Sequence, residues 1–185
     1  MGTKKYFDII IRELQHVRET VSEKDCEQLL SAIYSSGRVF CYGLGRAGFS
    51  MKAFTMRLMH FGKEVYFLNE TVTPGFGRDD LLIVSSASGE TAQLVALAKK
   101  ARELKGTVAV LTTEPNSSIT QFCDVVVAIN APSKNHPHSQ FQSEQPMSSL
   151  YEQALLMIGD ALIMQAVEES DEPEEWLLKR HANLE

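Results

Sequence analysis

The sequence predicts an α/β fold: a three-layer αβα sandwich built on a five-stranded parallel sheet, preceded by an N-terminal helical hairpin. Two observations lead to this prediction. Short apolar runs recur through the middle of the 185-residue chain, and most of them are separated by segments whose apolar residues repeat at helical spacing. Such runs are typical of parallel strands that helices cover on both faces. We expect a single domain over residues 1–185.

Two helical patterns precede the first apolar run and make up the N-terminal region, residues 1–36. The first pattern covers about residues 4–19. The second begins near Ser22, a good N-cap residue, and ends before Gly37, a common residue just past a helix. Two consecutive helices suggest an antiparallel hairpin that packs on the sheet or builds an oligomer interface.

The α/β core is expected over residues 37–130. Its strands are predicted at residues 39–42, 64–68, 81–84, 107–111 and 124–129. A helix is predicted at residues 49–60, a second between the third and fourth strands, and a short one near residues 117–122. The link between the second and third strands has the composition of a loop.

A polar segment with three prolines, residues 131–147, follows the core. A loop of this length inside a compact domain is usually functional or mobile. Its His136 and His138 have no cysteine or carboxylate cluster beside them, so we expect them to be solvated and expect no metal site. The C-terminal region, residues 148–185, carries a long apolar helix at about 148–167 and a short helix that opens at Pro173.

The composition is that of an ordinary globular protein, with 44% hydrophobic and 23% charged residues. The net charge of -6 and the lack of a basic block argue against a nucleic-acid or anionic-membrane partner. Three widely spaced cysteines (Cys26, Cys41 and Cys123) cannot form a complete set of disulfides. The sequence has no signal peptide pattern and no stretch that we judge long enough to span a bilayer. We therefore expect a reduced, cytoplasmic protein.

The clearest candidate site is a turn between the third strand and the next helix, where hydroxyl side chains crowd around Gly89: Ser85, Ser86, Ser88 and Thr91. A turn of this kind opens a helix whose first N–H groups are free and whose dipole favours an anion, most often a phosphate. The alternative is that Ser88 merely caps the helix and Thr91 is a good residue for its first turn. Four hydroxyls exceed what a cap needs, which favours phosphate binding.

The motif GLGRAG (residues 43–48) follows the first strand and matches the G-x-G-x-x-G pattern of dinucleotide sites, a weak signal by itself. A nicotinamide site needs an acidic residue near the end of the second strand, and neither Glu64 nor Glu70 is well placed for that role. The glycines more simply permit close approach of a small ligand to the backbone. In an open parallel sheet the turns after the first three strands could all meet at one cleft. The residues that would then face it are Arg46, Glu70, Thr73, Ser86, Ser88 and Thr91.

Glu152 is a candidate functional residue, although S-x-x-E at residues 149–152 is also a capping box, in which the glutamate serves only the helix start. His181 is a second candidate. The alternative for His181 is that it stands with Lys179 and Arg180 near a helix end, where cations suit the helix dipole. His60, on the predicted helix at residues 49–60, could be a functional residue or equally an interface residue.

These residues together resemble the SIS (sugar isomerase) domain family. The S-x-S-G-x-T motif of that family is present as Ser86, Ala87, Ser88, Gly89, Glu90 and Thr91, and it follows an apolar strand. Within the family the chain looks like the 6-phospho-3-hexuloisomerases. The stretches that carry this closer resemblance are GLGRAGFSMKAFTMRLMHFG (43–62), NETVTP (69–74), QPMSSLYEQALL (145–156) and HANLE (181–185).

The resemblance implies interconversion of D-arabino-hex-3-ulose 6-phosphate and fructose 6-phosphate, without metal or cofactor, in formaldehyde fixation through ribulose monophosphate. It implies phosphate binding by residues 86–91, Glu152 as proton-transferring base, and a homotetramer with sites completed across subunits. We assign His181 as a second catalytic residue, and Gly45, Arg46, Ala47 and Glu70 to the sugar phosphate. Many family members have serine where this chain has Ala47, which leaves only a backbone N–H there.

Moving a carbonyl from C3 to C2 requires removal of the proton alpha to the ketone and return of a proton to the neighbouring carbon of a cis-enediol. One carboxylate above both carbons can perform both transfers. Three alternatives stay open at this point: another aldose–ketose phosphosugar isomerase, a non-catalytic phosphosugar sensor, and a dinucleotide-binding reductase. A sensor of the transcription-regulator type would need a DNA-binding module, for which the acidic chain has no basic helix-turn-helix segment.

Overall fold

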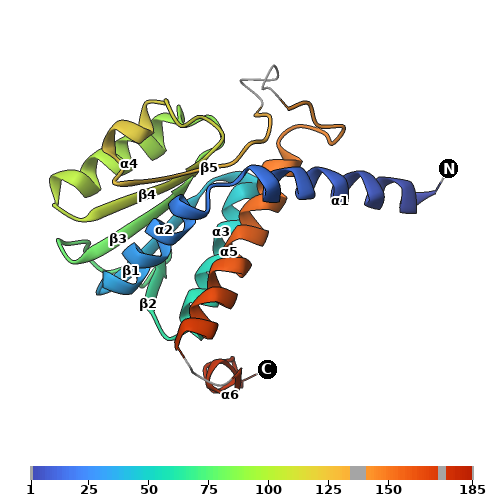
Figure 1. The fold of residues 1–185 in the computed structure, drawn as a ribbon. Coiled ribbons are helices and arrows are strands. Elements are labelled where there is room, and N and C mark those ends of the chain that lie inside the picture. Colours follow the sequence, from blue (N-terminus) through green and yellow to red (C-terminus); the bar gives the residue numbers. More distant parts are fainter. Residues whose placement is uncertain (1, 134–140, 171–173, 185) are drawn as a thin grey trace.

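The computed structural model describes residues 2–133, 141–170 and 174–184, and it places one parallel sheet at the centre of the molecule (Figure 1). The sheet has the strand order β2-β1-β3-β4-β5, and every neighbouring pair is parallel. Its strands are β1 (Arg38–Gly43), β2 (Glu64–Phe67), β3 (Asp80–Ser85), β4 (Thr107–Thr112) and β5 (Val125–Ala128). The predicted five-stranded parallel sheet is confirmed.

Helices cover both faces of the sheet. One face carries α2 (Glu23–Ser35), α3 (Gly45–His60) and α5 (Ser149–Ser170), whereas the other carries α4 (Ala92–Glu103) and the short 3₁₀ helix η1 (Ile119–Phe122). Successive side chains of a strand point to opposite faces. Thus Cys41 packs under α3 and α5, and its neighbour Phe40 packs under α4. The predicted three-layer sandwich is confirmed.

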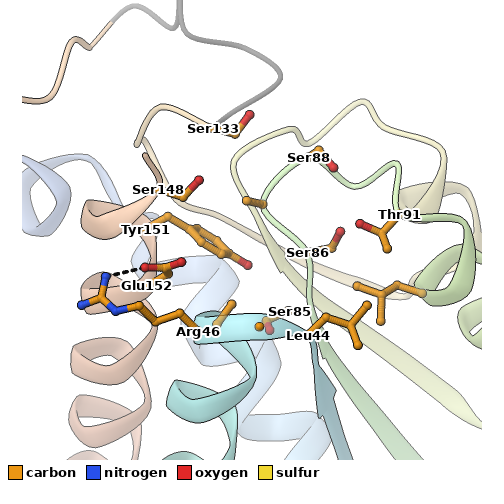
Figure 2. A pocket seen from close by; sticks show the side chains of 14 residues that line it. Leu44, Arg46, Ser85, Ser86, Ser88, Thr91, Ser133, Ser148, Tyr151 and Glu152 are labelled. Carbon is orange, nitrogen blue, oxygen red and sulfur yellow. Dashed lines mark hydrogen bonds and ion pairs between the residues drawn. The ribbon is translucent and has the colours of Figure 1, made fainter. Parts of the chain in front are cut away.

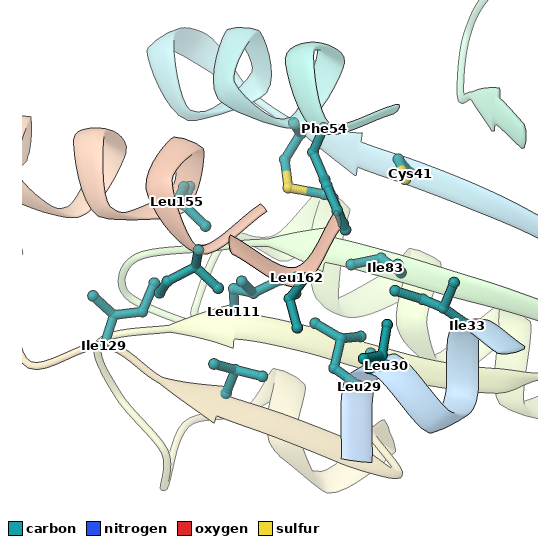
Figure 3. Packing of buried hydrophobic residues seen from close by; sticks show 14 of the residues in the cluster. Leu29, Leu30, Ile33, Cys41, Phe54, Ile83, Leu111, Ile129, Leu155 and Leu162 are labelled. Carbon is teal, nitrogen blue, oxygen red and sulfur yellow. The ribbon is translucent and has the colours of Figure 1, made fainter. Parts of the chain in front are cut away.

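The larger of the two apolar layers lies between the sheet and α2, α3 and α5 (Figure 3). Ile33 of α2, Phe54 of α3 and Leu162 of α5 are buried there against Ile83 of the central strand β3. A Cβ atom at Gly159 would lie 2.9 Å from the Phe54 ring, so the glycine lets α5 lie close to α3. Helix α5 is therefore fixed in the core over much of its length.

The two N-terminal helices precede the first strand as predicted, but they do not pack against each other as a closed hairpin. Helix α1 (Thr3–Thr20) extends outward from the domain, while α2 lies on the sheet beside β5 (Figure 1). Val21 and Ser22 join them with extended backbone, so the chain does not turn back sharply. Much of α1 is exposed, including Tyr6 and Phe7.

Helix α5 corrects one expectation about the membrane. Over its 22 residues it is long and apolar enough to cross a bilayer by length and composition alone. Half of its most apolar window is buried inside the protein, where it packs on α3, α1 and α2. Burial against the sheet and the neighbouring helices accounts for the apolar residues on one side of α5, whereas Leu156, Met157 and Met164 are apolar residues of its exposed side.

Helix α3 begins at Gly45, four residues earlier than predicted, because Gly45 and Gly48 belong to the helix, while Gly43 is the last residue of β1. The link between β2 and β3 is a loop, as predicted. The chain ends with α6 (Glu174–Leu178), beyond the far end of α5 (Figure 1). The predicted solvated His136 and His138, and the helix start at Pro173, lie outside the described residues.

Candidate functional site

A cleft of about 280 Å³ opens at the carboxyl ends of β1 and β3. These strands are neighbours at the point where the strand order reverses, which is where open parallel sheets bind ligands. The N-terminal ends of α3, α4 and α5 all reach the cleft (Figure 2). Its lining comprises Leu44, Gly45, Arg46, Ala47, Ser85, Ser86, Ala87, Ser88, Thr91, Leu94, Ser133, Ser148, Tyr151 and Glu152.

The serine turn (residues 86–91) forms one wall, and its hydroxyls are not used for helix capping in the way the alternative requires. Helix α4 begins at Ala92 with Thr91 as N-cap, and within the described chain the Thr91 side chain makes no capping bond. The Ser88 Oγ accepts a hydrogen bond from the Glu90 N–H at 3.2 Å, inside the turn. Ser86 Oγ is buried and has no partner among the described residues. A buried unpaired hydroxyl that lines a cleft is a ready donor for a ligand.

The GLGRAG glycines serve the packing of α3 on β1 more than the approach of a ligand. A Cβ at Gly48 would lie 2.6 Å from the Gly43 carbonyl oxygen, and one at Gly43 would overlap the Ser85 hydroxyl. Gly45 has φ +57°, which a residue with a side chain rarely adopts. This close contact places the start of α3, with Arg46 and Ala47, on the rim of the cleft.

Glu152 lies on the wall opposite the serine turn, in the first turn of α5 (Figure 2). Its carboxylate Oε2 accepts a hydrogen bond from Arg46 Nη1 at 2.6 Å, and its side chain is 16% exposed against 57% for Arg46. The Ser149 hydroxyl donates to the Pro146 carbonyl at 2.8 Å. In a capping box the side chains of Ser149 and Glu152 would accept hydrogen bonds from backbone N–H groups. Here Ser149 donates to a carbonyl and Glu152 accepts from Arg46, so both side chains are engaged differently, and the Glu152 carboxylate lies at the cleft.

Tyr151 is a residue of the cleft that the sequence reasoning missed. Its ring stands between Glu152 and Ser86 (Figure 2), and its hydroxyl donates to the Leu111 carbonyl at 2.8 Å. Burial raises the pKa of Tyr151 far above its ordinary value, so the hydroxyl keeps its proton. The signal in the sequence that could have identified Tyr151 was its position next to Glu152 at the start of a long apolar helix. Ser133 and Ser148 were also missed as lining residues, whereas Ser85 lines the cleft as expected.

Three residues assigned to the sugar phosphate lie outside the lining of the cleft. Glu90 accepts hydrogen bonds from the N–H and hydroxyl of Ser118, at 2.8 and 2.6 Å, and so fastens the turn to η1. Gly89 has φ +64°, and a Cβ there would overlap the Ser117 side chain. Glu70 forms an exposed ion pair with Lys52 at 2.9 Å. Gly89 and Glu90 thus shape the turn.

His181 follows α6, and that helix lies beyond the end of α5 opposite to the first turn, which carries Glu152 (Figure 1). Its ring stacks on His60, with centroids 5.4 Å apart. Burial, Arg57 and His181 lower the pKa of His60. The structure therefore brings Glu152, Arg46 and the serine turn together, and it leaves His181 apart from them.

The cysteines lie outside the lining of the cleft. The three cysteines are free, and burial raises the pKa of Cys41 to about 12. Among the described residues, no three His, Cys, Asp or Glu side chains gather closely enough to hold a metal ion.

Comparison with known proteins identifies related chains over the full length. The model of the SIS domain family matches residues 32–164. A 3-hexulose-6-phosphate isomerase of Bacillus subtilis is 38% identical over 185 residues, which covers all of both chains. A protein of the same name from Mycobacterium gastri is 38% identical over 91% of this chain and 86% of its own.

Solved structures agree on the fold. A Methanococcus jannaschii protein, whose crystal structure was used to infer a 3-hexulose-6-phosphate isomerase function, has a TM-score of 0.84 at 28% identity, covering 98% and 99% of the two chains. The sugar isomerase domain of a transcription factor from Sphaerobacter thermophilus has a TM-score of 0.73 at 18% identity, covering 94% and 92%. This second likeness concerns the fold alone.

Proposed function

We propose that this chain, which belongs to the SIS domain family, is a 3-hexulose-6-phosphate isomerase that interconverts D-arabino-hex-3-ulose 6-phosphate and fructose 6-phosphate. The observation that carries the proposal is a carboxylate, Glu152, facing a hydroxyl-rich helix start across a cleft of about 280 Å³. The helix start suits the phosphate, and the carboxylate suits the carbon atoms of the sugar. A relative with this name matches the chain over its whole length.

In this proposal the serine turn binds the phosphate through backbone N–H groups at the start of α4 and through the hydroxyls of Ser86, Ser88 and Thr91. Glu152 removes a proton from the carbon next to the ketone, and a cis-enediol forms. Glu152 then returns the proton to the neighbouring carbon, which completes the isomerisation. General base catalysis of this kind contributes roughly 10²–10⁴-fold to a rate. The reaction needs no cofactor, because no electrons leave the sugar.

A second proton must move between the two sugar oxygens, and we assign that role to His181. In one chain His181 is remote from Glu152, so it would act at the cleft of another copy. This requirement fits a homotetramer with sites completed across subunits. Exposed apolar side chains on three helices support such an assembly: Tyr6, Phe7 and Ile11 of α1, Phe49 and Met56 of α3, and Met164 of α5.

The proposed setting is the cytoplasm, within formaldehyde fixation through ribulose monophosphate. The partners we propose are the sugar phosphate and further copies of the same chain. Neither a nucleic acid nor a membrane is part of the proposal, which agrees with the net charge of -6.

The test is isomerase activity on hexulose 6-phosphate, made in place from ribulose 5-phosphate and formaldehyde by a hexulose-phosphate synthase. Fructose 6-phosphate formation is followed by a coupled assay. We expect turnover that disappears in Glu152→Gln, while fructose 6-phosphate still raises the melting temperature of that variant. Retained turnover would dismiss Glu152 as the base. Absent turnover in the wild type, with fructose 6-phosphate binding intact, would indicate another phosphosugar isomerase or a sensor.

A further inference from the structure

Helix α1 carries a buried carboxylate that the proposed reaction does not use. Glu13 is only 2% exposed, although most of its helix faces solvent. It accepts hydrogen bonds from the Ser143 hydroxyl and the Glu144 N–H, both at 2.6 Å, and from Gln145 Nε2 at 2.9 Å. A buried carboxylate is costly unless it is hydrogen-bonded, so these three donors are held firmly on α1.

His16, one turn further along α1, contacts the chain at two more places. Its ring stacks on Phe141 with centroids 3.9 Å apart and planes 12° apart. Its Nε2 lies 3.2 Å from Asn130 Nδ2. Arg12 adds an exposed ion pair with Glu144. Together Glu13 and His16, which we call the α1 clamp, hold residue 130 and residues 141–145.

The stretches held by the α1 clamp lead directly into the wall of the cleft. Ser133 lines the cleft three residues after Asn130, and Ser148 lines it three residues after Gln145. The Ser148 carbonyl accepts the N–H of Glu152 at 3.1 Å. The clamp is thus connected through a short run of backbone to the first turn of α5, which carries the proposed base.

Side-chain bonds continue this connection to the rim. Ser149 donates its hydroxyl to the Pro146 carbonyl at 2.8 Å and accepts a hydrogen bond from Arg46 Nη1 at 3.2 Å. Arg46 is also the partner of Glu152. A displacement of residues 141–147 would therefore shift both members of the ion pair, whereas the serine turn on the opposite wall is anchored separately through Glu90 and Ser118.

We infer that Glu13 and His16 are positioning residues for the isomerisation: they fix the segment before α5 so that Glu152 stands over the sugar carbons. This inference rests on the proposed function. In this inference the α1 clamp acts on one wall of the cleft only: it sets the position of Glu152 and not that of the serine turn. It also gives the described part of the 131–147 loop a role in supporting the site.

The test compares Glu13→Gln with Asp8→Asn, which removes an exposed carboxylate from the same helix. Glutamine retains the shape of glutamate but replaces one acceptor with a donor that opposes the donors around it. We expect kcat to fall about tenfold, below the roughly 10²-fold that a 1 Å misplacement can cost. KM should change by less than about twofold, and amide hydrogen exchange across residues 143–152 should accelerate. Asp8→Asn should change none of these.

Ser143→Ala is the second variant, because it removes one donor from the loop side in case Glu13→Gln does not fold. Unchanged hydrogen exchange in both variants would overturn the clamp. Accelerated exchange with kcat unchanged, or a loss that appears only in KM, would overturn its positioning role. These results are distinct from failure of the proposed function, which would appear as an inactive wild-type protein.

Discussion

Arg46 and Glu152 meet at the rim of the cleft, with the guanidinium Nη1 2.6 Å from the carboxylate Oε2. The same nitrogen lies 3.2 Å from the Ser149 hydroxyl. The proposed base is therefore paired with a cation that is itself more than half exposed. An incoming sugar phosphate is an anion, so it would compete with Glu152 for Arg46.

Arg46→Ala should raise KM for the sugar phosphate about tenfold, the lower part of the range for a hydrogen bond to a charged group, because the side chain is half exposed. The difference in KM between the variant and the wild type should be smaller at high salt, because salt screens the attraction between the guanidinium and the sugar phosphate in the wild type. Steady-state kinetics at two ionic strengths measure this. Arg57→Ala is the matched control: Arg57 is an exposed arginine on the same helix, paired with Asp160 at 3.9 Å. An unchanged KM for Arg46→Ala would exclude Arg46 from substrate binding.

Ser86→Ala should separate ligand binding from stability. The Ser86 hydroxyl is buried without a partner among the described residues, so its removal should leave the melting temperature of the free protein unchanged or raise it. The shift in melting temperature produced by fructose 6-phosphate should decrease, and KM should rise about tenfold. Thermal denaturation with and without fructose 6-phosphate tests both effects, with exposed Ser31→Ala as the control. An unaltered ligand shift would remove Ser86 from the site.

Gly89→Ala should destabilise the protein by about 1–3 kcal/mol, because a Cβ would overlap Ser117 and the φ of +64° is strained for alanine. For a chain of this size we expect the melting temperature to fall by roughly 2–12 °C. Among the described residues nothing lies within 4 Å of a Cβ placed on Gly75. Gly75→Ala should therefore leave the melting temperature nearly unchanged. Equal effects of the two substitutions would contradict the steric argument.

The contact between His60 and His181 should weaken in acid. Burial, Arg57 and His181 lower the pKa of His60 from its ordinary value of 6.5. The stability contributed by neutral His60 is therefore present above pH 6.5 and is lost as pH falls below 6.5 through the lowered pKa. Trp176, the single tryptophan, packs on Phe61 in the same region, with ring centroids 5.6 Å apart. Its fluorescence should change on acidification.

His60→Phe is the control for this pH effect, because it keeps an aromatic ring and removes the titrating group. The fluorescence of Trp176 in this variant should be insensitive to pH over the interval where the wild type changes. A pH response of equal size in both proteins would assign the change to another group.

The sheet and the serine turn could be predicted because both are local in the sequence. Apolar runs such as residues 81–84 mark buried strands, and the hydroxyls at residues 86–91 follow directly on a strand. The cleft at the strand ends then follows from the geometry of parallel sheets. The predicted start of α3 is too late because glycines lower helix propensity, which argues against a helix over the GLGRAG motif. In the structure Gly48 lies within the helix, where the absence of a side chain allows its close contact with Gly43.

The parts that could not be predicted depend on contacts between distant segments. Glu13 looks like an ordinary polar residue of an amphipathic helix until residues 143–145 close over it. Tyr151 reads as one more apolar residue of α5 until its hydroxyl reaches Leu111 on β4. His181 stacks on His60 at the last residue of α3, whereas Arg46 lies at the start of that helix, so only the proposed assembly of several copies would bring His181 to a cleft.

Helix α5 combines two properties that proteins often separate. Its first turn carries Glu152, and its remaining turns fill the core against α3, with Gly159 in contact with Phe54. A base on a surface loop can leave its position through small local fluctuations, but a base on a core helix belongs to the cooperative unit that unfolds last. While the α1 clamp holds the segment before α5, we therefore expect the proposed catalytic carboxylate of the wild-type protein to keep its position until the domain unfolds, so that loss of activity on heating follows the global unfolding transition.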